Sequence, residues 1–166
     1  MPHAMESNEV CQRFNEISWH DSELRGIFLN YSRKEPGAEY TYEIILKVDL
    51  STLQTPSGGE VFAPIEVGFV HSRYFHTDLD LLGVGYCGGD ISGAKCFEES
   101  HFKRQIFQTK IAKFNLPQDP SSWANLKHFQ IDLCNPSGEI DIIAEDFRRR
   151  DLTPSGSKDG RTITLL

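Results

Sequence analysis

Two short clusters hold the residue types that could carry chemistry. The first is the run Trp19-His20-Asp21-Ser22, in which a carboxylate follows an imidazole directly. An Asp can orient a His ring, and the pair can contribute to a metal site or to a partner-binding site. Adjacent residues of an extended chain point to opposite faces, so His20 and Asp21 do not meet automatically. The structural alternative has Trp19 packing a helix onto a sheet while Asp21 and Ser22 bond to turn backbone.

The second cluster is His71, His76 and Asp78, followed by Asp80 and Cys87. Imidazole and carboxylate are suitable ligands for a divalent metal, which makes His71, His76 and Asp78 candidate metal ligands. Their spacing matches none of the named metal motifs. The alternative is a polar loop with solvated charges.

No motif of established catalytic meaning is present. The glycine-rich loop Gly83–Asp90 contains G-x-G, but it lacks the third glycine and the βαβ pattern of a dinucleotide site, and it lacks the Lys-Ser/Thr of a P-loop. A hinge or turn is predicted there. Cys87 is a candidate reactive thiol near His76, but no companion motif supports a Cys–His nucleophile. The pattern therefore favours a protein that is not an enzyme, and it predicts no cofactor.

The four cysteines are scattered and form no C-x-x-C pair; they are Cys11, Cys87, Cys96 and Cys134. This spacing fits neither a disulfide framework nor a zinc ribbon. The first residues show no secretory signal, and no run approaches the roughly 18 apolar residues of a membrane span. We therefore expect a cytoplasmic protein with reduced thiols and no membrane partner.

The net charge of −7 lies in one half of the chain. Residues 1–83 carry 13 acidic and 6 basic residues, whereas residues 84–166 carry 11 of each. Phosphate binding needs a basic footprint, so nucleic acid is not expected as a partner, and a basic protein is. Arg148–Arg150 stand beside Asp146 and Asp151, which indicates a solvated strand end rather than a nucleic-acid patch. Solubility is the simplest alternative reason for the acidic charge.

The elements that must position these residues are mostly strands. The clearest is Tyr40–Leu50, where apolar residues alternate with mostly polar ones, as in a half-buried antiparallel strand. Turn residues at 35–38 predict a hairpin with the strand before it. Helical spacing predicts an N-terminal helix. The predicted elements are a helix at 9–17, strands at 24–33, 40–50, 61–71, 129–133 and 140–144, an extended segment at 78–84, a helix or helix plus strand at 98–114, a helical turn at 119–126 and an edge strand at 162–166.

Together these elements predict a single domain over 1–166, with loose tails at about 1–8 and 153–166. Its class is α+β and mainly β. We expect an antiparallel sheet or open barrel of about six or seven strands, with an N-terminal helix and one or two short helices.

The W-H-D-S-x-L step at Trp19–Leu24 into a first strand, followed by a long hairpin, resembles small bacterial β-rich proteins of uncharacterised function. It is similar to one of the immunity-protein families of polymorphic toxin systems, whose members open with an H-D-[AS] step into a β-rich domain. The likeness covers about the first fifth of the chain. It implies a bacterial protein that neutralises a partner by binding it, with Trp19, His20, Asp21 and Ser22 as candidate contact residues and no catalytic residues.

Three functions follow as hypotheses. The first is a protein-binding module of the immunity type. The second is a metal-dependent enzyme that uses His20, Asp21, His71, His76 and Asp78. The third is a ligand-binding β-barrel with Tyr31, Tyr40, Tyr42 and Phe69 around a cavity. The sequence leaves the oligomeric state open.

Overall fold

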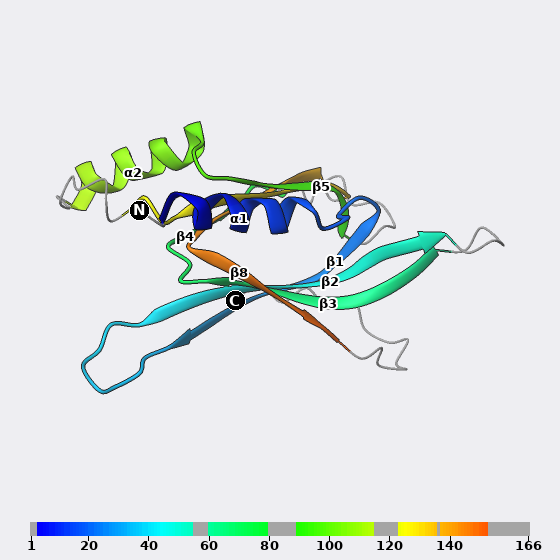
Figure 1. The fold of residues 1–166 in the computed structure, drawn as a ribbon, viewed down its shortest axis with the longest axis horizontal. Coiled ribbons are helices and arrows are strands. Elements are labelled where there is room, and N and C mark those ends of the chain that lie inside the picture. The colour runs from blue at the N-terminus through cyan, green and yellow to red at the C-terminus, as the bar shows by residue number, and fades with distance from the viewer. Residues whose placement is uncertain (1–2, 55–59, 80–88, 115–122, 136, 153–166) are drawn as a thin grey trace.

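The strands of the described residues form one antiparallel sheet, and buried and exposed side chains alternate along most of them (Figure 1). The computed structural model describes residues 3–54, 60–79, 89–114, 123–135 and 137–152. Their elements are α1 (His3–Asn15), β1 (Ser22–Ser32), β2 (Thr41–Gln54), β3 (Glu60–Val70), β4 (Tyr74–Thr77), β5 (Gly89–Phe97), α2 (His101–Phe114), β6 (Lys127–Asn135), β7 (Ser137–Ala144) and β8 (Asp146–Asp151).

The eight strands of this described part lie in the order β4-β7-β6-β5-β1-β2-β3-β8, and the sheet does not close into a barrel. This confirms the predicted mainly β class, with an antiparallel sheet and an N-terminal helix. The sheet divides into two layers where β5 meets β1, because these strands share only three residue pairs, from Ser22↔Ile91 to Leu24↔Gly89. In Figure 1, β5 lies in the upper layer with both helices, and β1, β2, β3 and β8 form the lower layer.

The chain also crosses between the layers at the start of each edge strand. It leaves β3 for β4 through residues 71–73, and it leaves β7 for β8 through Glu145. The Arg73 N–H donates to the carbonyl of Ile143 at 2.7 Å, and the Glu145 N–H donates to the carbonyl of Val70 at 3.1 Å. These bonds join the two crossings, so each layer is held to the other at this corner.

The core between the layers is centred on Phe14 of α1, whose side chain is fully buried. Its ring centroid lies 4.9 Å from that of Trp19, 5.0 Å from Phe129, 5.1 Å from Phe147 and 6.1 Å from Phe69. Edge-to-face and tilted contacts of this kind stabilise beyond the area they bury. One helix residue therefore contacts strands of both layers.

The alternation predicted for 40–50 is confirmed over most of its length. Ile44, Leu46, Val48 and Leu50 of β2 are all buried, and their neighbours on β3 supply the facing apolar residues. Tyr40 and Tyr42 are the exceptions, because 45% of the surface of each stays exposed.

Two expectations for single segments need correction. Residues 3–8 belong to α1 rather than to a tail. The segment Gly83–Asp90, expected as a hinge or turn, runs into a strand, β5, from Gly89, where a Cβ would lie 3.0 Å from the Cβ of Leu24. The Arg148–Arg150 run is exposed at the end of a strand, as expected, but that strand is β8, an edge strand that was not among the predicted elements. The short strand β4 was not among them either. The predictions for 80–84, 119–122 and 153–166 lie outside the described residues.

Candidate functional site

The ends of β1 and β2 and the loop between them form a projecting hairpin, residues 29–43, which we call the hairpin arm. Its register pairs Leu29 with Ile44 and Tyr31 with Tyr42. A turn at 35–38 closes the arm, with Gly37 in the left-handed region at φ 90° and the Ala38 N–H donating to the carbonyl of Glu35 at 3.0 Å. Figure 1 shows the arm extending beyond the rest of the lower layer.

One face of the arm continues the inward face of the sheet. Cross-strand partners share a face, so Leu29 and Tyr31 lie on the same side as Ile44 and Tyr42. Ile44 is buried in the core, but Leu29 is 43% exposed and Tyr31 63% exposed. The apolar face that is buried at Ile44 therefore continues beyond the core, and its side chains on the arm are exposed.

Three tyrosine rings gather on this face. The ring centroid of Tyr31 lies 5.8 Å from that of Tyr40 and 6.5 Å from that of Tyr42. The guanidinium carbon of Arg33 lies 5.4 Å from the centroid of Tyr40, within the range of a cation–π contact. We call the exposed residues Leu29, Tyr31, Tyr40 and Tyr42 the tyrosine face.

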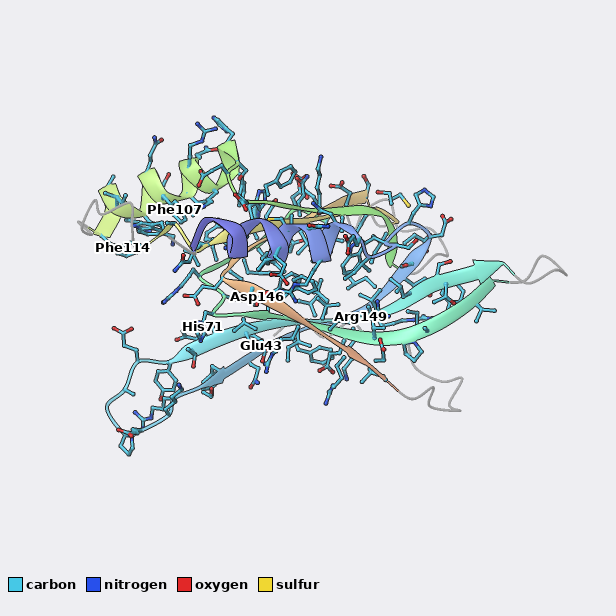
Figure 2. All side chains as sticks on the ribbon, viewed as in Figure 1. Glu43, His71, Phe107, Phe114, Asp146 and Arg149 are labelled. Carbon is cyan, nitrogen blue, oxygen red and sulfur yellow. The ribbon has the colours of Figure 1, made fainter. Side chains whose placement is uncertain are left out.

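The opposite face of the arm is polar. Asn30, Ser32, Thr41 and Glu43 alternate with the tyrosine face. A hollow of about 250 Å³ at this place is lined by these four residues and by Tyr31, Tyr42, Val70, His71 and Arg148. Glu43 accepts a hydrogen bond from Arg148 at 2.5 Å, and this contact raises the pKa of Arg148 above its ordinary value. Figure 2 places Glu43 and His71 where the arm leaves the body. The Arg148–Glu43 ion pair ties the base of the arm to β8.

The predicted contact cluster Trp19–Ser22 is split between the interior and the surface. Trp19 is buried and its indole N–H donates to the carbonyl of Phe14 at 3.2 Å. Ser22 is also buried, and its hydroxyl accepts from the Ser51 N–H at 3.0 Å. Only His20 and Asp21 are on the surface, where they form an ion pair at 2.9 Å. They meet because Asp21 adopts a positive φ of 62°, which an alternating extended chain does not have.

The predicted metal ligands each have another contact. His71 Nδ1 lies 2.6 Å from a carboxylate oxygen of Glu145, and the ring of His76 stacks on Phe102. An oxygen of Asp78 accepts from the Glu139 N–H at 2.8 Å. Among the described residues, the structure gathers no group of three or more His, Cys, Asp or Glu that could hold a metal ion. His71, His76 and Asp78 therefore do not come together as a metal site.

The residues proposed for a ligand-binding barrel are brought together only in part. Tyr31, Tyr40 and Tyr42 are neighbours, as expected, but on an exposed arm rather than around a cavity. Phe69 is fully buried in the core.

A polar trio at the start of α2, with His128 and Asp141 buried and Ser100 half-buried, was not predicted from the sequence. His128 is buried, its Nε2 lies 2.8 Å from a carboxylate oxygen of Asp141, and its Nδ1 lies 2.9 Å from the hydroxyl of Ser100. These are the groups of a nucleophilic triad. However, the Ser100 hydroxyl also accepts the Lys103 N–H at 3.0 Å, as a helix N-cap does.

The surroundings of this trio point to a structural role. The rings of Phe97 and Phe102 both stack on His128, with centroids 5.6 and 4.8 Å away. The imidazole is thus enclosed and both its nitrogens have partners. The trio fastens the start of α2 to the sheet. Its members are 13 to 41 residues apart in the sequence, so no local pattern could have identified it.

Comparison with known proteins gives no match to a protein family, to a curated protein or to a solved structure. Within the described residues, neither helix has the length and apolar character needed to cross a membrane.

Proposed function

We propose that this chain is a protein-binding module of the immunity type, which neutralises a basic partner protein and contacts it through the tyrosine face. The observation that carries the proposal is that the inward, apolar face of the sheet continues past the core onto the hairpin arm, where its side chains are exposed. Contiguous exposed apolar surface on a projecting element is typical of interaction sites.

The residue types on the tyrosine face suit protein recognition. Tyrosine offers a large, rigid contact area at low entropic cost, and it is enriched among residues that dominate binding energy. The T-shaped contact between Tyr31 and Tyr40 holds their rings in place before a partner arrives. Such preorganisation reduces the ordering cost of binding.

The charge of the chain favours a basic partner. A net charge of −7 steers positively charged proteins toward the molecule. Arg33 already lies over the Tyr40 ring, so this ring accepts a guanidinium group, and an arginine of the partner can use the same contact.

Site-specific photo-crosslinking in the host cell tests the proposal. We expect the variants Tyr31→p-benzoylphenylalanine and Tyr40→p-benzoylphenylalanine to crosslink one and the same protein, with an isoelectric point above about 9. Asn30→p-benzoylphenylalanine, on the opposite face of the same arm, is the matched control and should give far less of this product. Equal crosslinking from Asn30, or an acidic crosslinked protein, would contradict the proposal.

Binding of the identified partner then gives the second measurement. Tyr31→Ala should weaken its affinity at least tenfold, because truncating a central aromatic contact typically costs more than about 1 kcal/mol. Asn30→Ala should leave the affinity within about twofold. An unchanged affinity in Tyr31→Ala would refute the tyrosine face as the contact surface.

A further inference from the structure

Two buried cysteines face each other across the contact between α1 and β5. Cys11 lies in α1 and Cys96 in β5, and both side chains are almost fully buried. Their Sγ atoms are 2.6 Å apart, although the residues are separated by 85 positions in the sequence. A disulfide bond needs a separation of about 2.05 Å, so only a small movement is required to form it.

Asn15, one helical turn after Cys11, holds the backbone of β5 in place against α1. The side-chain oxygen of Asn15 accepts the Cys96 N–H at 2.7 Å, and its side-chain nitrogen donates to the Cys96 carbonyl at 3.4 Å. Residues i and i+4 share a helix face, so Cys11 and Asn15 both point at β5. The clamp on the Cys96 backbone therefore keeps its sulfur opposite that of Cys11.

The two sulfurs are chemically unequal. The hydrogen bond with Cys96 lowers the pKa of Cys11, and nearby Lys127 and Lys103 act in the same direction against its burial. The pKa of Cys96 is raised, first by the same hydrogen bond and then by burial. The thiolate is the reactive form, so the cysteine of the pair that ionises is the nucleophile and the other is the resolving thiol.

We propose that Cys11 and Cys96 are a site of reversible oxidation, at which a peroxide converts the two thiols into a disulfide that locks α1 onto β5. The thiolate of one cysteine attacks one peroxide oxygen and breaks the O–O bond, which gives a sulfenic acid and, for hydrogen peroxide, hydroxide. The sulfur of the other cysteine then attacks the sulfenic sulfur and displaces its oxygen, which leaves as water with the proton of that second thiol. Two thiols are oxidised and one peroxide is reduced to two molecules of water.

The locked state has a predictable stability. A disulfide between residues 11 and 96 closes a long loop and restricts the unfolded chain, so oxidation should raise the Tm by about 10 °C. Reduction by dithiothreitol should restore the original Tm. The site adds to the proposed binding function and does not depend on it.

Mass spectrometry of the oxidised full-length chain tests the proposal. The parent variant carries Cys87→Ser and Cys134→Ser, so that only the pair can react. After reduction and treatment with hydrogen peroxide, its mass should fall by about 2 Da, and proteolysis should release a Cys11–Cys96 peptide. A gain of oxygen mass without this peptide, or an unchanged mass, overturns the proposal.

The wild-type chain supplies the control for selectivity. It contains Cys134, which is an exposed free thiol. With a sub-stoichiometric amount of hydrogen peroxide we expect the Cys11–Cys96 peptide to form before Cys134 is oxidised. If Cys134 is consumed first, or if Cys11 pairs with another cysteine, the geometry has no chemical consequence and the proposal fails.

Discussion

Ile44 stands where the buried sheet face gives way to the exposed tyrosine face. Its side chain is buried, its N–H bonds to the hydroxyl of Ser72 at 3.2 Å, and it pairs with Leu29 on one side and Phe69 on the other. A single residue here thus belongs both to the core and to the base of the arm.

Ile44→Asp should abolish folding at 25 °C. The substitution places a carboxylate among apolar side chains without a partner, and burying an unpaired charge costs several kcal/mol, a large share of the total stability. Circular dichroism and urea titration check this expectation. The control is Ile45→Asp, because Ile45 lies on the other face of β2 and is only half-buried. A folded, cooperative Ile44→Asp protein would show that Ile44 is not a core residue.

The run Trp19–Ser22 shows how one short motif divides into separate roles at this scale. Trp19 and Ser22 stabilise the junction between α1 and β1 through the Phe14 carbonyl and the Ser51 N–H. His20 and Asp21 remain on the surface as an exposed ion pair. Solvent and salt screen the attraction between exposed charges, so this pair contributes little to stability. Any contact with a partner at this motif therefore involves His20 and Asp21 alone.

At the scale of elements, the hairpin arm is separable from the core. Its tyrosines are exposed, and two contacts tie its base to the body: the Arg148–Glu43 ion pair, and the Tyr42 carbonyl, which accepts the Ser72 N–H at 2.8 Å. The arm consequently contributes little buried area, whereas β2 beyond Ile44 contributes much of the core.

Shortening the arm should leave the fold intact. The variant replaces residues 32–41 by Asn-Gly, a two-residue turn suited to hairpins, and carries Tyr31→Thr and Tyr42→Thr. It keeps the backbone carbonyl at position 42 and removes every exposed tyrosine of the arm. We expect a Tm within about 4 °C of the parent, since about 1 kcal/mol shifts the Tm of a domain of this size by 2–4 °C. Differential scanning calorimetry measures this shift.

A larger destabilisation would show that the arm packs against the body. The matched control is the chain with only Tyr31→Thr and Tyr42→Thr, which separates the loss of the rings from the loss of the loop. If the shortened variant keeps the parent's Tm but no longer binds the partner identified by crosslinking, the loss concerns binding and not folding.

The strands that the sequence predicts well are those with uninterrupted period-two burial. Residues 40–50 reveal β2 because its neighbours on both sides are strands and its inward face is continuous. β5 was missed because its glycines and its register shifts against β6 interrupt the alternation. β8 was missed because an edge strand with exposed arginines carries almost no apolar signal.

The candidate site was predictable in part for a similar reason. Period two places Tyr40 and Tyr42 on the face of Ile44, and the hairpin brings Tyr31 beside them. Their exposure depends on where the other layer ends, which is a property of the tertiary fold. The Cys11–Cys96 pair and the trio around His128 depend on the same long-range packing, so neither follows from local spacing.

At the scale of the whole molecule, the two layers share one core. Phe14 contacts Phe69 and Phe147 of the lower layer and Phe129 of the upper layer, and all four side chains are buried. The Arg73–Ile143 and Glu145–Val70 backbone bonds join the crossings at the other corner. Neither layer can therefore open without exposing the aromatic centre that the other layer needs.

We therefore expect the reduced chain to unfold in a single cooperative transition. Far-ultraviolet circular dichroism follows both layers, whereas the fluorescence of Trp19 follows the aromatic centre, provided that Trp123 is replaced by Phe. The two urea curves should coincide, which is the test of two-state unfolding for a chain of this size. Phe14→Leu serves as the comparison: it removes the ring contacts between the layers, and it should lower the midpoint of both curves together. Curves that separate in the parent protein would mean that one layer unfolds before the other. The shared aromatic core would then be too weak to couple the layers, and they would come apart at the short β5–β1 pairing.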